Sequence, residues 1–275
     1  FGKDWSSTGW PLSLYSGPSH LASLLVAVAR HLPDSATATL PMPPTLGPSP
    51  RERWGKQMQG FAKRRPYLWR NHRAAVQEGF LEVGTSSVLT FPTGAGKSTM
   101  SELKVATALL RDLKVVFLAP TLALVDQTAK SLDAMFPQAT VQGERPEQSP
   151  FNLAEEILPT ITVMTPERCL VMLSFNPQAF DEVGLLVFDE CHLLHPRASD
   201  RSRRAVDSML CLLNFTARVP AADLLLISAM ISNASALAEW IADLTTRPCL
   251  ALDLTWKPTR QVRGCVLYRT EDIRT

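Results

Sequence analysis

The segment that most constrains the fold is residues 91–99, which read Phe-Pro-Thr-Gly-Ala-Gly-Lys-Ser-Thr. A short apolar run precedes this segment and a stretch of helical length follows it, so it joins a strand to a helix. Gly94 and Gly96 allow the backbone to curl tightly, and the amides at the helix N-terminus can then face inward. Such a concavity binds anionic groups. The segment therefore predicts a phosphate loop within an α/β fold.

Two side chains in this loop carry the groups that a triphosphate needs. Lys97 would reach the β- and γ-phosphates, and Ser98 would place its hydroxyl on Mg²⁺. The strict phosphate-loop pattern requires glycine where this chain has Phe91, so the strict match fails. The alternative is a glycine-rich turn with a chance lysine. We expect nucleotide contacts from Thr93, Gly94, Ala95, Gly96, Lys97, Ser98 and Thr99.

Apolar runs alternate with helix-length segments between about residues 66 and 250. The runs lie at 88–91, 114–119, 161–164, 185–188 and 224–227. Helical patterns between them include residues 100–110 and 122–135. Continuous apolar strands separated by helices predict a parallel sheet that is covered on both faces. Ligands of such sheets bind at the carboxyl ends of the strands, which is where the motifs of this chain fall.

Two adjacent carboxylates, Asp189 and Glu190, follow the apolar run at 185–188. Neighbouring side chains at a strand end point in different directions, so the two acids can take different tasks. Asp189 can hold the Mg²⁺ that Ser98 also contacts, and Glu190 can orient and deprotonate an attacking water. A solvated acidic turn after a buried strand is the alternative. The phosphate loop upstream favours the catalytic interpretation.

With these motifs in order, the chain resembles the first RecA-like domain of the superfamily 2 DEAD/DEAH-box helicases. Motif I corresponds to residues 91–99, and residues 189–192 resemble a DExH-type motif II. Motifs Ia, Ib and III resemble residues 119–127, 165–168 and 228–230. Two further segments, 228–241 and 256–260, are similar to the Ski-type branch. The resemblance extends from about residue 66 to residue 260.

The resemblance implies two RecA-like lobes with ATP between them and a single nucleic-acid strand gripped by motifs Ia and Ib. On the family's pattern, the catalytic residues are Lys97, Asp189, Glu190 and His192. Nucleic-acid contacts are expected from Pro120, Thr121, Gln127, Thr165, Pro166 and Arg168. Coupling between the two sites is expected from Ser228, Ala229 and Met230. Thr121 and Thr165 are short polar donors at helix starts, and simple N-capping is the alternative for both.

Many superfamily 2 helicases carry a glutamine upstream of motif I that reads adenine. The spacing to Lys97 places His72 at that position. One imidazole cannot both donate to N7 and accept from the N6 amine, so we predict weaker base selectivity than a glutamine gives. Adenine reading by Asn71 or by a backbone carbonyl is the alternative. Tyr67 is an aromatic residue of the kind that such helicases often place beside the adenine.

The first 65 residues follow a different pattern. Ser19 is predicted to cap a helix over residues 20–30, after which six prolines between 33 and 50 predict a linker or an extended strap. The stretches 51–56 and 63–70 mix basic and aromatic residues, which suits nucleic acid. We favour a solvated basic strap with core aromatics. Residues 251–275 would lead to a second RecA-like domain.

Composition limits the partners and the compartment. The net charge of +2 is too small to indicate nucleic acid, so any such surface must be local. The five cysteines include no Cys-x-x-Cys pair, which argues against a zinc site and for a reducing compartment. The apolar run 21–29 is too short to span a bilayer and no signal-peptide pattern is present, so we expect a cytoplasmic protein without membrane contact. Because no methionine begins the chain, we expect part of a longer protein or a trimmed form.

The sequence therefore predicts an α/β P-loop NTPase with a RecA-like parallel sheet, helices on both faces and an N-terminal helical, proline-rich extension. We expect an ATP- and Mg²⁺-dependent helicase on DNA or RNA, acting with a second lobe in the same longer chain or in a larger complex. Without the arginine fingers of that lobe, hydrolysis should be feeble. Alternatives are a translocase that leaves strands paired and a non-catalytic scaffold. A small-molecule kinase leaves residues 189–192 unexplained.

Overall fold

A seven-stranded sheet forms the centre of the computed structural model, which describes residues 17–47, 50–144, 157–194, 203–229, 231 and 233–256. The strand order is β3-β4-β2-β5-β6-β1-β7, and every neighbouring pair is parallel. The strands are β1 (Ser86–Thr90), β2 (Lys114–Leu118), β3 (Val141–Gly143), β4 (Ile161–Met164), β5 (Val183–Asp189), β6 (Asp223–Ser228) and β7 (Cys249–Asp253). The predicted parallel α/β sheet is confirmed.

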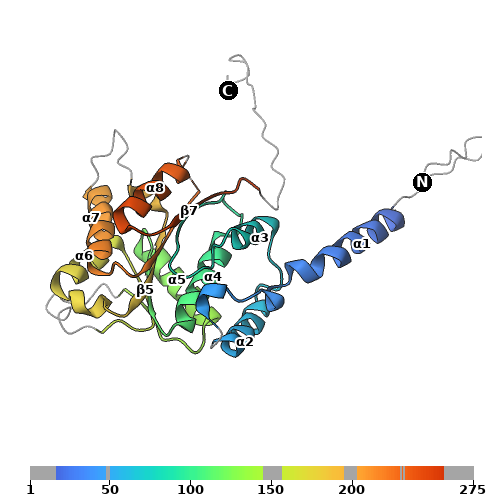
Figure 1. Ribbon diagram of the computed structural model, residues 1–275, viewed down its shortest axis with the longest axis horizontal. Helices are drawn as coiled ribbons and strands as arrows, with labels where there is room; N and C mark the ends of the chain where they lie inside the picture. Colours follow the sequence, from blue (N-terminus) through green and yellow to red (C-terminus); the bar gives the residue numbers. More distant parts are fainter. Residues whose placement is uncertain are drawn as a thin grey trace, which may run out of the picture.

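Helices cover both faces of the sheet (Figure 1). The long helices are α1 (Gly17–Ser35), α2 (Arg51–Ala62), α3 (Arg70–Gln77), α4 (Lys97–Leu110), α5 (Leu122–Met135), α6 (Pro166–Phe175), α7 (Arg203–Arg218) and α8 (Ala234–Thr245). Short 3₁₀ turns are η2 (Thr37–Thr39), η3 (Pro44–Leu46), η5 (Pro177–Phe180) and η6 (Cys191–Leu194). Helices α2 to α5 pack in one core and α6 to α8 in the other.

The division into two cores follows from the alternation of side chains along each strand. In β1, Leu89 belongs to the core under α4 and its neighbour Val88 belongs to the core under α7 and α8. The same split separates Val115 from Val116 in β2. Successive strand residues point to opposite faces, so a strand buried on both faces must be apolar throughout. This explains why the strands appear in the sequence as unbroken apolar runs.

Two edge strands were not anticipated from the sequence. β3 is only three residues long and half-buried, and it pairs with β4 alone. β7 pairs with β1 and runs to Asp253, past the boundary that the sequence predicted at residue 250. Edge strands have one neighbour and little burial, so they carry no strong apolar pattern.

The N-terminal segment is partly built into the globular body. Trp54 and Phe61 of α2 are buried in the first core, and the Trp54 indole donates to the carbonyl of Leu40 at 2.8 Å. Helix α2 thus lies ahead of the predicted boundary at residue 65 but packs with the sheet. The amide of Leu68 donates to Ser35 O at 2.7 Å, which fixes the end of α1 beside the start of α3.

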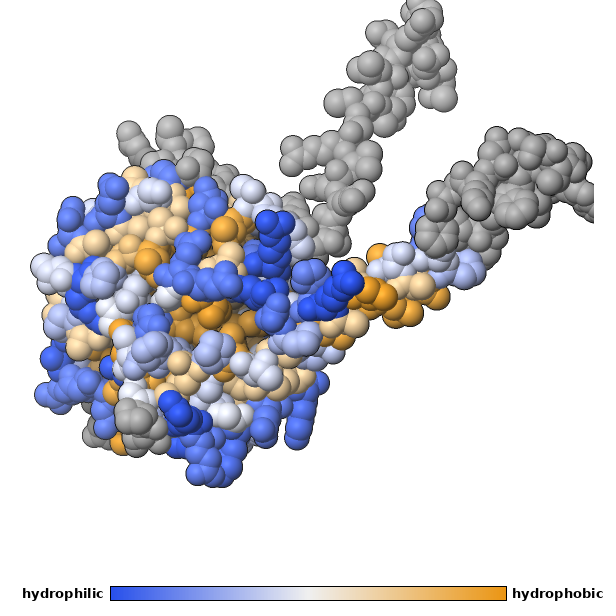
Figure 2. All heavy atoms as spheres, turned by 45° about the vertical axis from the view of Figure 1, so that its right-hand side comes forward, coloured by the Kyte–Doolittle hydropathy of each residue, from blue (hydrophilic) through white to orange (hydrophobic). Residues whose placement is uncertain are grey.

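Helix α1 is longer than the predicted helix over residues 20–30 and projects from the body (Figure 1). None of the residues of α1 is buried. The projecting helix carries exposed apolar side chains (Figure 2), and these include Leu21, Leu24 and Leu25. In the part of the chain that the structure describes, no helix is long and apolar enough to cross a membrane.

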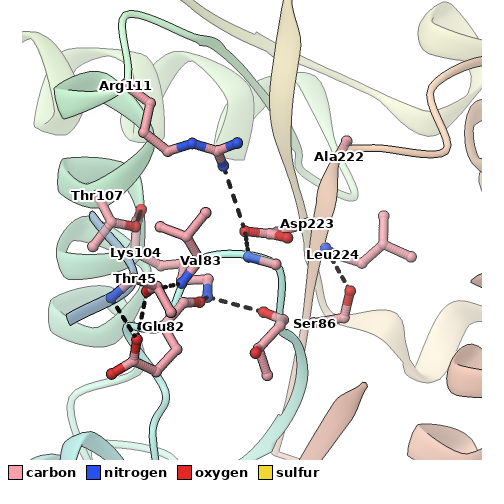
Figure 3. A network of polar contacts seen from close by, with 12 residues as sticks. Thr45, Glu82, Val83, Ser86, Lys104, Thr107, Arg111, Ala222, Asp223 and Leu224 are labelled. Carbon is pink, nitrogen blue, oxygen red and sulfur yellow. Dashed lines mark hydrogen bonds and ion pairs between the residues drawn. The ribbon is translucent and has the colours of Figure 1, made fainter. Parts of the chain in front are cut away.

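A buried polar network anchors α4 at the end far from the phosphate loop (Figure 3). The Lys104 amine donates to the carbonyls of Phe80, Glu82 and Thr85 at 2.8 to 3.0 Å, and burial lowers the pKa of Lys104 to about 8. Asp223, at the start of β6, accepts from the Gly84 amide at 3.1 Å and pairs with Arg111 at 3.8 Å and with Arg247 at 2.6 Å. The network ties the C-terminal half of α4 to the loop before β1 and to β6.

Candidate active site

The phosphate loop connects the end of β1 to the first residue of α4, Lys97. Gly94 and Gly96 have φ angles of 79° and 82°, in the left-handed region that favours glycine. A Cβ at Gly96 would also lie 2.3 Å from the His72 ring, whereas a Cβ at Gly94 would meet no described atom within 4 Å. The backbone is therefore curled as the sequence predicted, with the first amides of α4 left without intrahelical acceptors.

Lys97 and Glu190 meet at the carboxyl end of the sheet. Lys97 Nζ lies 3.3 Å from Glu190 Oε1, and both side chains are partly buried. Glu190 has a φ of 54°, an uncommon backbone conformation for a residue with a side chain, and follows the last residue of β5. Its other oxygen, Oε2, lies 3.1 Å from His192 Nδ1. A backbone conformation of this kind persists only where the surrounding structure holds it in place. Such conformations are concentrated at functional sites.

Asp189 supplies the second carboxylate at this strand end. Burial and the neighbouring charge of Glu190 raise the pKa of Asp189, and its Oδ1 accepts from the Glu190 amide at 3.0 Å. Two carboxylates with repelling charges are stabilised by a cation between or beside them. Ser98 lines the same cavity as both acids. A hydroxyl and carboxylates are ligands that Mg²⁺ prefers, so the residues present fit this ion.

Two hollows adjoin at Lys97 and Ser98. The larger, of about 500 Å³, is lined by the loop residues Gly94, Gly96 and Thr99 and by residues 64–67, Trp69 and His72. The smaller, of about 190 Å³, holds Asp189 and Glu190 and is walled by α4 and α5. We call the larger hollow the base-side cleft and the smaller one the catalytic cavity. Together they have room for a nucleotide with its terminal phosphate at the acids.

His72 and Asn71 both contact the phosphate loop. His72 Nε2 lies 3.1 Å from Ala95 O, and His72 Nδ1 accepts from the Trp69 amide at 3.3 Å. Burial lowers the pKa of His72 to about 4, so the ring is neutral, with its proton on Nε2. The Asn71 amide also donates to Ala95 O, at 2.8 Å. Both ring nitrogens have backbone partners here, and adenine reading by His72 stays a prediction.

The aromatic side chains of the base-side cleft are accessible. Tyr67 is 48% exposed and Trp69 is 39% exposed, and both line the cleft. The Trp69 ring stacks on the His72 imidazole with a centroid distance of 5.3 Å. A flat, partly exposed aromatic surface beside a phosphate loop is suited to stacking on a nucleotide base. Tyr67 lines the base-side cleft, and its place beside the adenine stays a prediction.

The two predicted strand-binding helix starts differ in their polar partners. Thr121 caps α5 by accepting from the Leu124 amide at 3.3 Å, and Leu122 next to it is exposed. Thr165 caps α6 in the same way, but its amide and hydroxyl both donate to Glu144 Oε2 at 2.8 Å. Pro120 precedes the α5 cap, and Pro166 and Arg168 lie in the first turn of α6. The capping role of the threonines is observed, and their contact with nucleic acid stays a prediction.

Gln127, which the sequence assigned to nucleic acid, lines the catalytic cavity with Asp189 and Glu190. It lies on α5 between the N-terminal cap at Thr121 and the end of the helix. One helix therefore adjoins the predicted strand-binding surface at its start and the catalytic acids along its side.

Of the predicted coupling residues, Ser228 is linked through His192 to Glu190. His192 Nδ1 lies 3.3 Å from Ser228 Oγ and 3.1 Å from Glu190 Oε2. Ser228 ends β6, and Ala229 follows it. Met230 lies outside the described residues. Cys191, beside His192, is buried, and burial raises the pKa of its thiol, which suits a packing residue.

The sequence analysis named Arg65 only as part of the basic and aromatic stretch 63–70 and did not single out Glu102. The two form an ion pair in which Arg65 lines the base-side cleft and Glu102 the catalytic cavity. Glu102 is buried on α4, five residues beyond Lys97. A carboxylate among the apolar positions of this helix was the only available signal, because its partner is distant in the sequence.

The family model for DEAD/DEAH box helicases matches residues 71–237, which is more than half of the chain. This chain belongs to the DEAD/DEAH box helicase family. The predicted first RecA-like domain of superfamily 2, similar to the Ski-type branch, is thereby confirmed.

Several curated helicases are similar to this DEAD/DEAH-box domain. The DExH-box ATP-dependent RNA helicase DExH10 of Arabidopsis thaliana is 29% identical over 67% of the chain and 17% of the relative. The ATP-dependent RNA helicase mtr4 of Schizosaccharomyces pombe is 28% identical over 67% of the chain and 15% of the relative. The ATP-dependent DNA helicase Hel308 of Thermoplasma acidophilum is 25% identical over 63% of the chain and 25% of the relative. The chain thus spans a quarter or less of the length of these proteins.

Solved structures of the DUF1998 helicase MrfA share the fold. The complex with DNA superposes with a TM-score of 0.53 at 18% identity, over 78% of this chain and 31% of that one. The complex with DNA and AMPPNP gives a TM-score of 0.54 at 19% identity, over 79% and 30%. At this identity the likeness shows the fold of the DEAD/DEAH-box domain. The family match identifies a DEAD/DEAH box helicase domain, and the relatives DExH10 and mtr4 are ATP-dependent RNA helicases.

Proposed function

We propose that this domain is the N-terminal lobe of a motor that couples ATP hydrolysis to movement on, or unwinding of, DNA or RNA. The observation that carries the proposal is the meeting of Lys97, Asp189 and Glu190 at the carboxyl end of one parallel sheet, with Lys97 Nζ 3.3 Å from Glu190 Oε1. The base-side cleft and the catalytic cavity adjoin at Lys97.

The chain's own residues divide the chemistry between them. Lys97 and the amides of the first turn of α4 bind the β- and γ-phosphates, and Ser98 and Asp189 hold Mg²⁺. The ion supplies charge neutralisation on the phosphate oxygens. Glu190 takes a proton from the attacking water as the water oxygen bonds to the γ-phosphorus. The bond between the γ-phosphorus and the bridging oxygen breaks, and that oxygen stays with the β-phosphate. The Lys97 ammonium must leave Glu190 to reach a phosphate, which frees the base at the step where it is needed.

Strand binding and coupling are assigned to the loops at the same sheet edge. Pro120, Thr121 and Gln127 of motif Ia and Thr165, Pro166 and Arg168 of motif Ib would grip the strand. Ser228, Ala229 and Met230 would relay the state of the ATP site. The contacts from Glu190 to His192 and from His192 to Ser228 support this assignment.

His72 and Tyr67 by themselves would hold the nucleotide base with little selectivity in this proposal. The His72 ring is neutral and bonded to backbone on both sides, and Tyr67 lies exposed in the base-side cleft. Stacking on an aromatic ring is available to any base. The adenine contact of His72 is retained as part of the proposal, together with the contacts from Thr93 to Thr99.

The second lobe belongs to the same proposal. In this proposal residues 1–65 form the extension, of which α2 packs against the first RecA-like domain; that domain runs from residue 66 to the end of β7, and the residues after it, up to 275, lead toward a second RecA-like lobe in a longer chain. An arginine finger from such a second lobe is worth about 10³ to 10⁵ in the rate of hydrolysis. The first lobe alone should therefore bind ATP but hydrolyse it slowly.

The test is an ATPase assay on the protein together with its second lobe, with and without single-stranded RNA or DNA. The proposal expects Lys97-dependent ATP binding and hydrolysis that a strand accelerates. A strand-separation assay then distinguishes a helicase from a translocase that leaves strands paired. Strand binding without any Lys97-dependent nucleotide binding would instead identify a non-catalytic scaffold.

A further inference from the structure

Arg65 lines the base-side cleft and forms an ion pair with Glu102, which lines the catalytic cavity. Arg65 Nε donates to Glu102 Oε2 at 3.3 Å, and Nη2 donates to Oε1 at 3.4 Å. The Glu102 side chain is 3% exposed, whereas the Arg65 side chain is 41% exposed. The carboxylate therefore holds the guanidinium from the buried side. A guanidinium has five N–H donors, so its remaining donors are available on the cleft side.

The backbone of Arg65 is also fixed in place. The Thr37 hydroxyl donates to Arg65 O at 2.6 Å, and the Arg65 amide donates to Phe61 O at 2.9 Å. The Thr37 amide donates to the next carbonyl, that of Pro66, at 3.0 Å. Arg64, its neighbour in the same cleft, is exposed and has no such side-chain anchor among the described residues. Of these two arginines, Arg65 is the one presented in a defined position.

The ion pair is difficult to explain by stability. Only 3% of the Glu102 side chain is exposed where it lies on α4, and this burial raises the pKa of its carboxyl group. Desolvation of the buried carboxylate offsets much of its attraction to the half-exposed guanidinium, so the pair is weak evidence for a structural role. A positioned cation in a nucleotide cleft has a direct use, because it can donate to acceptors on the ligand.

The ring nitrogens of His72 and the amide nitrogen of Asn71 already have backbone partners, whereas the buried Asn71 Oδ1 has none among the described residues. His72 Nε2 and the Asn71 amide both bond to Ala95 O, and His72 Nδ1 bonds to the Trp69 amide. Lys97 lies at the phosphate end, 3.3 Å from Glu190. Arg65 lines the cleft together with Tyr67, whose ring is exposed there.

We propose that Arg65, oriented by Glu102, is the residue that reads the purine base of the bound nucleotide. This inference rests on the proposed function, which places a nucleotide in the cleft. Arginine only donates. Adenine offers it one acceptor, N7, beside the N6 amine donor, whereas guanine offers two acceptors, N7 and O6. Arg65 therefore makes one bond to adenine and two to guanine, and GTP binds at least as tightly as ATP.

The experiment is a titration of the protein with ATP, GTP, CTP and inorganic tripolyphosphate. Wild type should bind GTP at least as tightly as ATP, and CTP more weakly than either. Arg65→Met should weaken GTP by about tenfold or more and ATP by a smaller factor, in line with the discrimination of a good bidentate contact. CTP and tripolyphosphate should be unchanged, because neither offers a purine edge.

Two further variants separate orientation from charge. Glu102→Gln keeps an acceptor but removes the charge that holds the guanidinium, and should lose part of the GTP affinity. Arg65→Lys keeps the charge without the planar pair of donors, and should lose the preference of GTP over CTP. Arg53→Met is the matched control, because Arg53 pairs with Asp112 on the surface and lies outside the cleft lining. Thermal melting would check that each variant is folded.

An equal loss for ATP, GTP and CTP in Arg65→Met would overturn the base-reading role, and so would unchanged affinity for all of them. Wild type that prefers ATP strongly over GTP would overturn it as well. These results leave the proposed function intact as long as binding depends on Lys97. If no nucleotide binds in a Lys97-dependent way, the proposed function itself fails.

Discussion

Lys97 Nζ lies 3.3 Å from Glu190 Oε1, so the proposed phosphate-binding cation and the proposed catalytic base neutralise each other in this structure. The lysine begins α4 and the glutamate follows β5, two elements that meet only through the fold of the sheet. Because one ammonium cannot serve both partners fully, a bound triphosphate competes with Glu190 for Lys97. Binding of the nucleotide and release of the base are therefore linked.

Removal of Lys97 should weaken nucleotide binding. Loss of a charge-assisted contact costs about 1.5–3 kcal/mol, so Lys97→Ala should lower ATP affinity roughly ten- to a hundredfold. Titration with a fluorescent ATP analogue measures this. Lys56→Ala is the control, because Lys56 pairs with Glu52 on the surface of α2. Equal affinities of wild type and Lys97→Ala would exclude the assigned role.

Glu190→Gln should separate binding from turnover. The amide keeps the shape of the side chain but cannot take a proton, so hydrolysis should slow by about 10² to 10⁴ while ATP still binds. The assay requires the protein with its second lobe. Glu182→Gln provides the comparison, since Glu182 is an exposed carboxylate paired with Lys114. A turnover rate equal to that of wild type would show that another group activates the water.

Ser228→Ala should impair coupling more than nucleotide binding. The substitution removes the hydroxyl 3.3 Å from His192 Nδ1 and leaves the contact of His192 with Glu190 in place. We expect similar ATP affinity but less stimulation of hydrolysis by a nucleic-acid strand. Ser174→Ala is the control, because Ser174 bonds only within α6 in the described structure. Stimulation that matches wild type would indicate that Ser228 only packs.

His72 should make the domain sensitive to acid. Its folded-state pKa of about 4 lies below the ordinary value of 6.5, because the buried neutral ring resists protonation. The unfolded chain then binds more protons between these values, so the stabilisation is present above pH 6.5 and is lost as the pH falls toward 4. Chemical denaturation across this range would measure the loss. In His72→Gln the pH dependence should flatten, and an unchanged slope would assign the acid sensitivity to other groups.

Local sequence determined the phosphate loop and the main strands. Gly94 and Gly96 stand where the chain needs φ angles near 80°, and that need arises within a single turn. The strands β1, β2, β4, β5 and β6 are visible as unbroken apolar runs because burial on both faces demands apolar residues throughout. Lys97, Asp189 and Ser228 each follow one of these runs closely, so the sequence pattern alone places them at the carboxyl edge of the sheet.

Tertiary packing decided the partners of the polar side chains. His72 contacts Ala95 O, and Arg65 pairs with Glu102. Each contact joins residues more than 20 positions apart, and no local pattern encodes such contacts. Gln127 faces the catalytic cavity because α5 packs beside α4, which its spacing from Thr121 does not reveal. The weak edge strands β3 and β7 were missed for a related reason, since a strand with one neighbour needs little apolar character. Local geometry is written in neighbouring residues, whereas the choice of a hydrogen-bond partner depends on which elements the hydrophobic cores bring together.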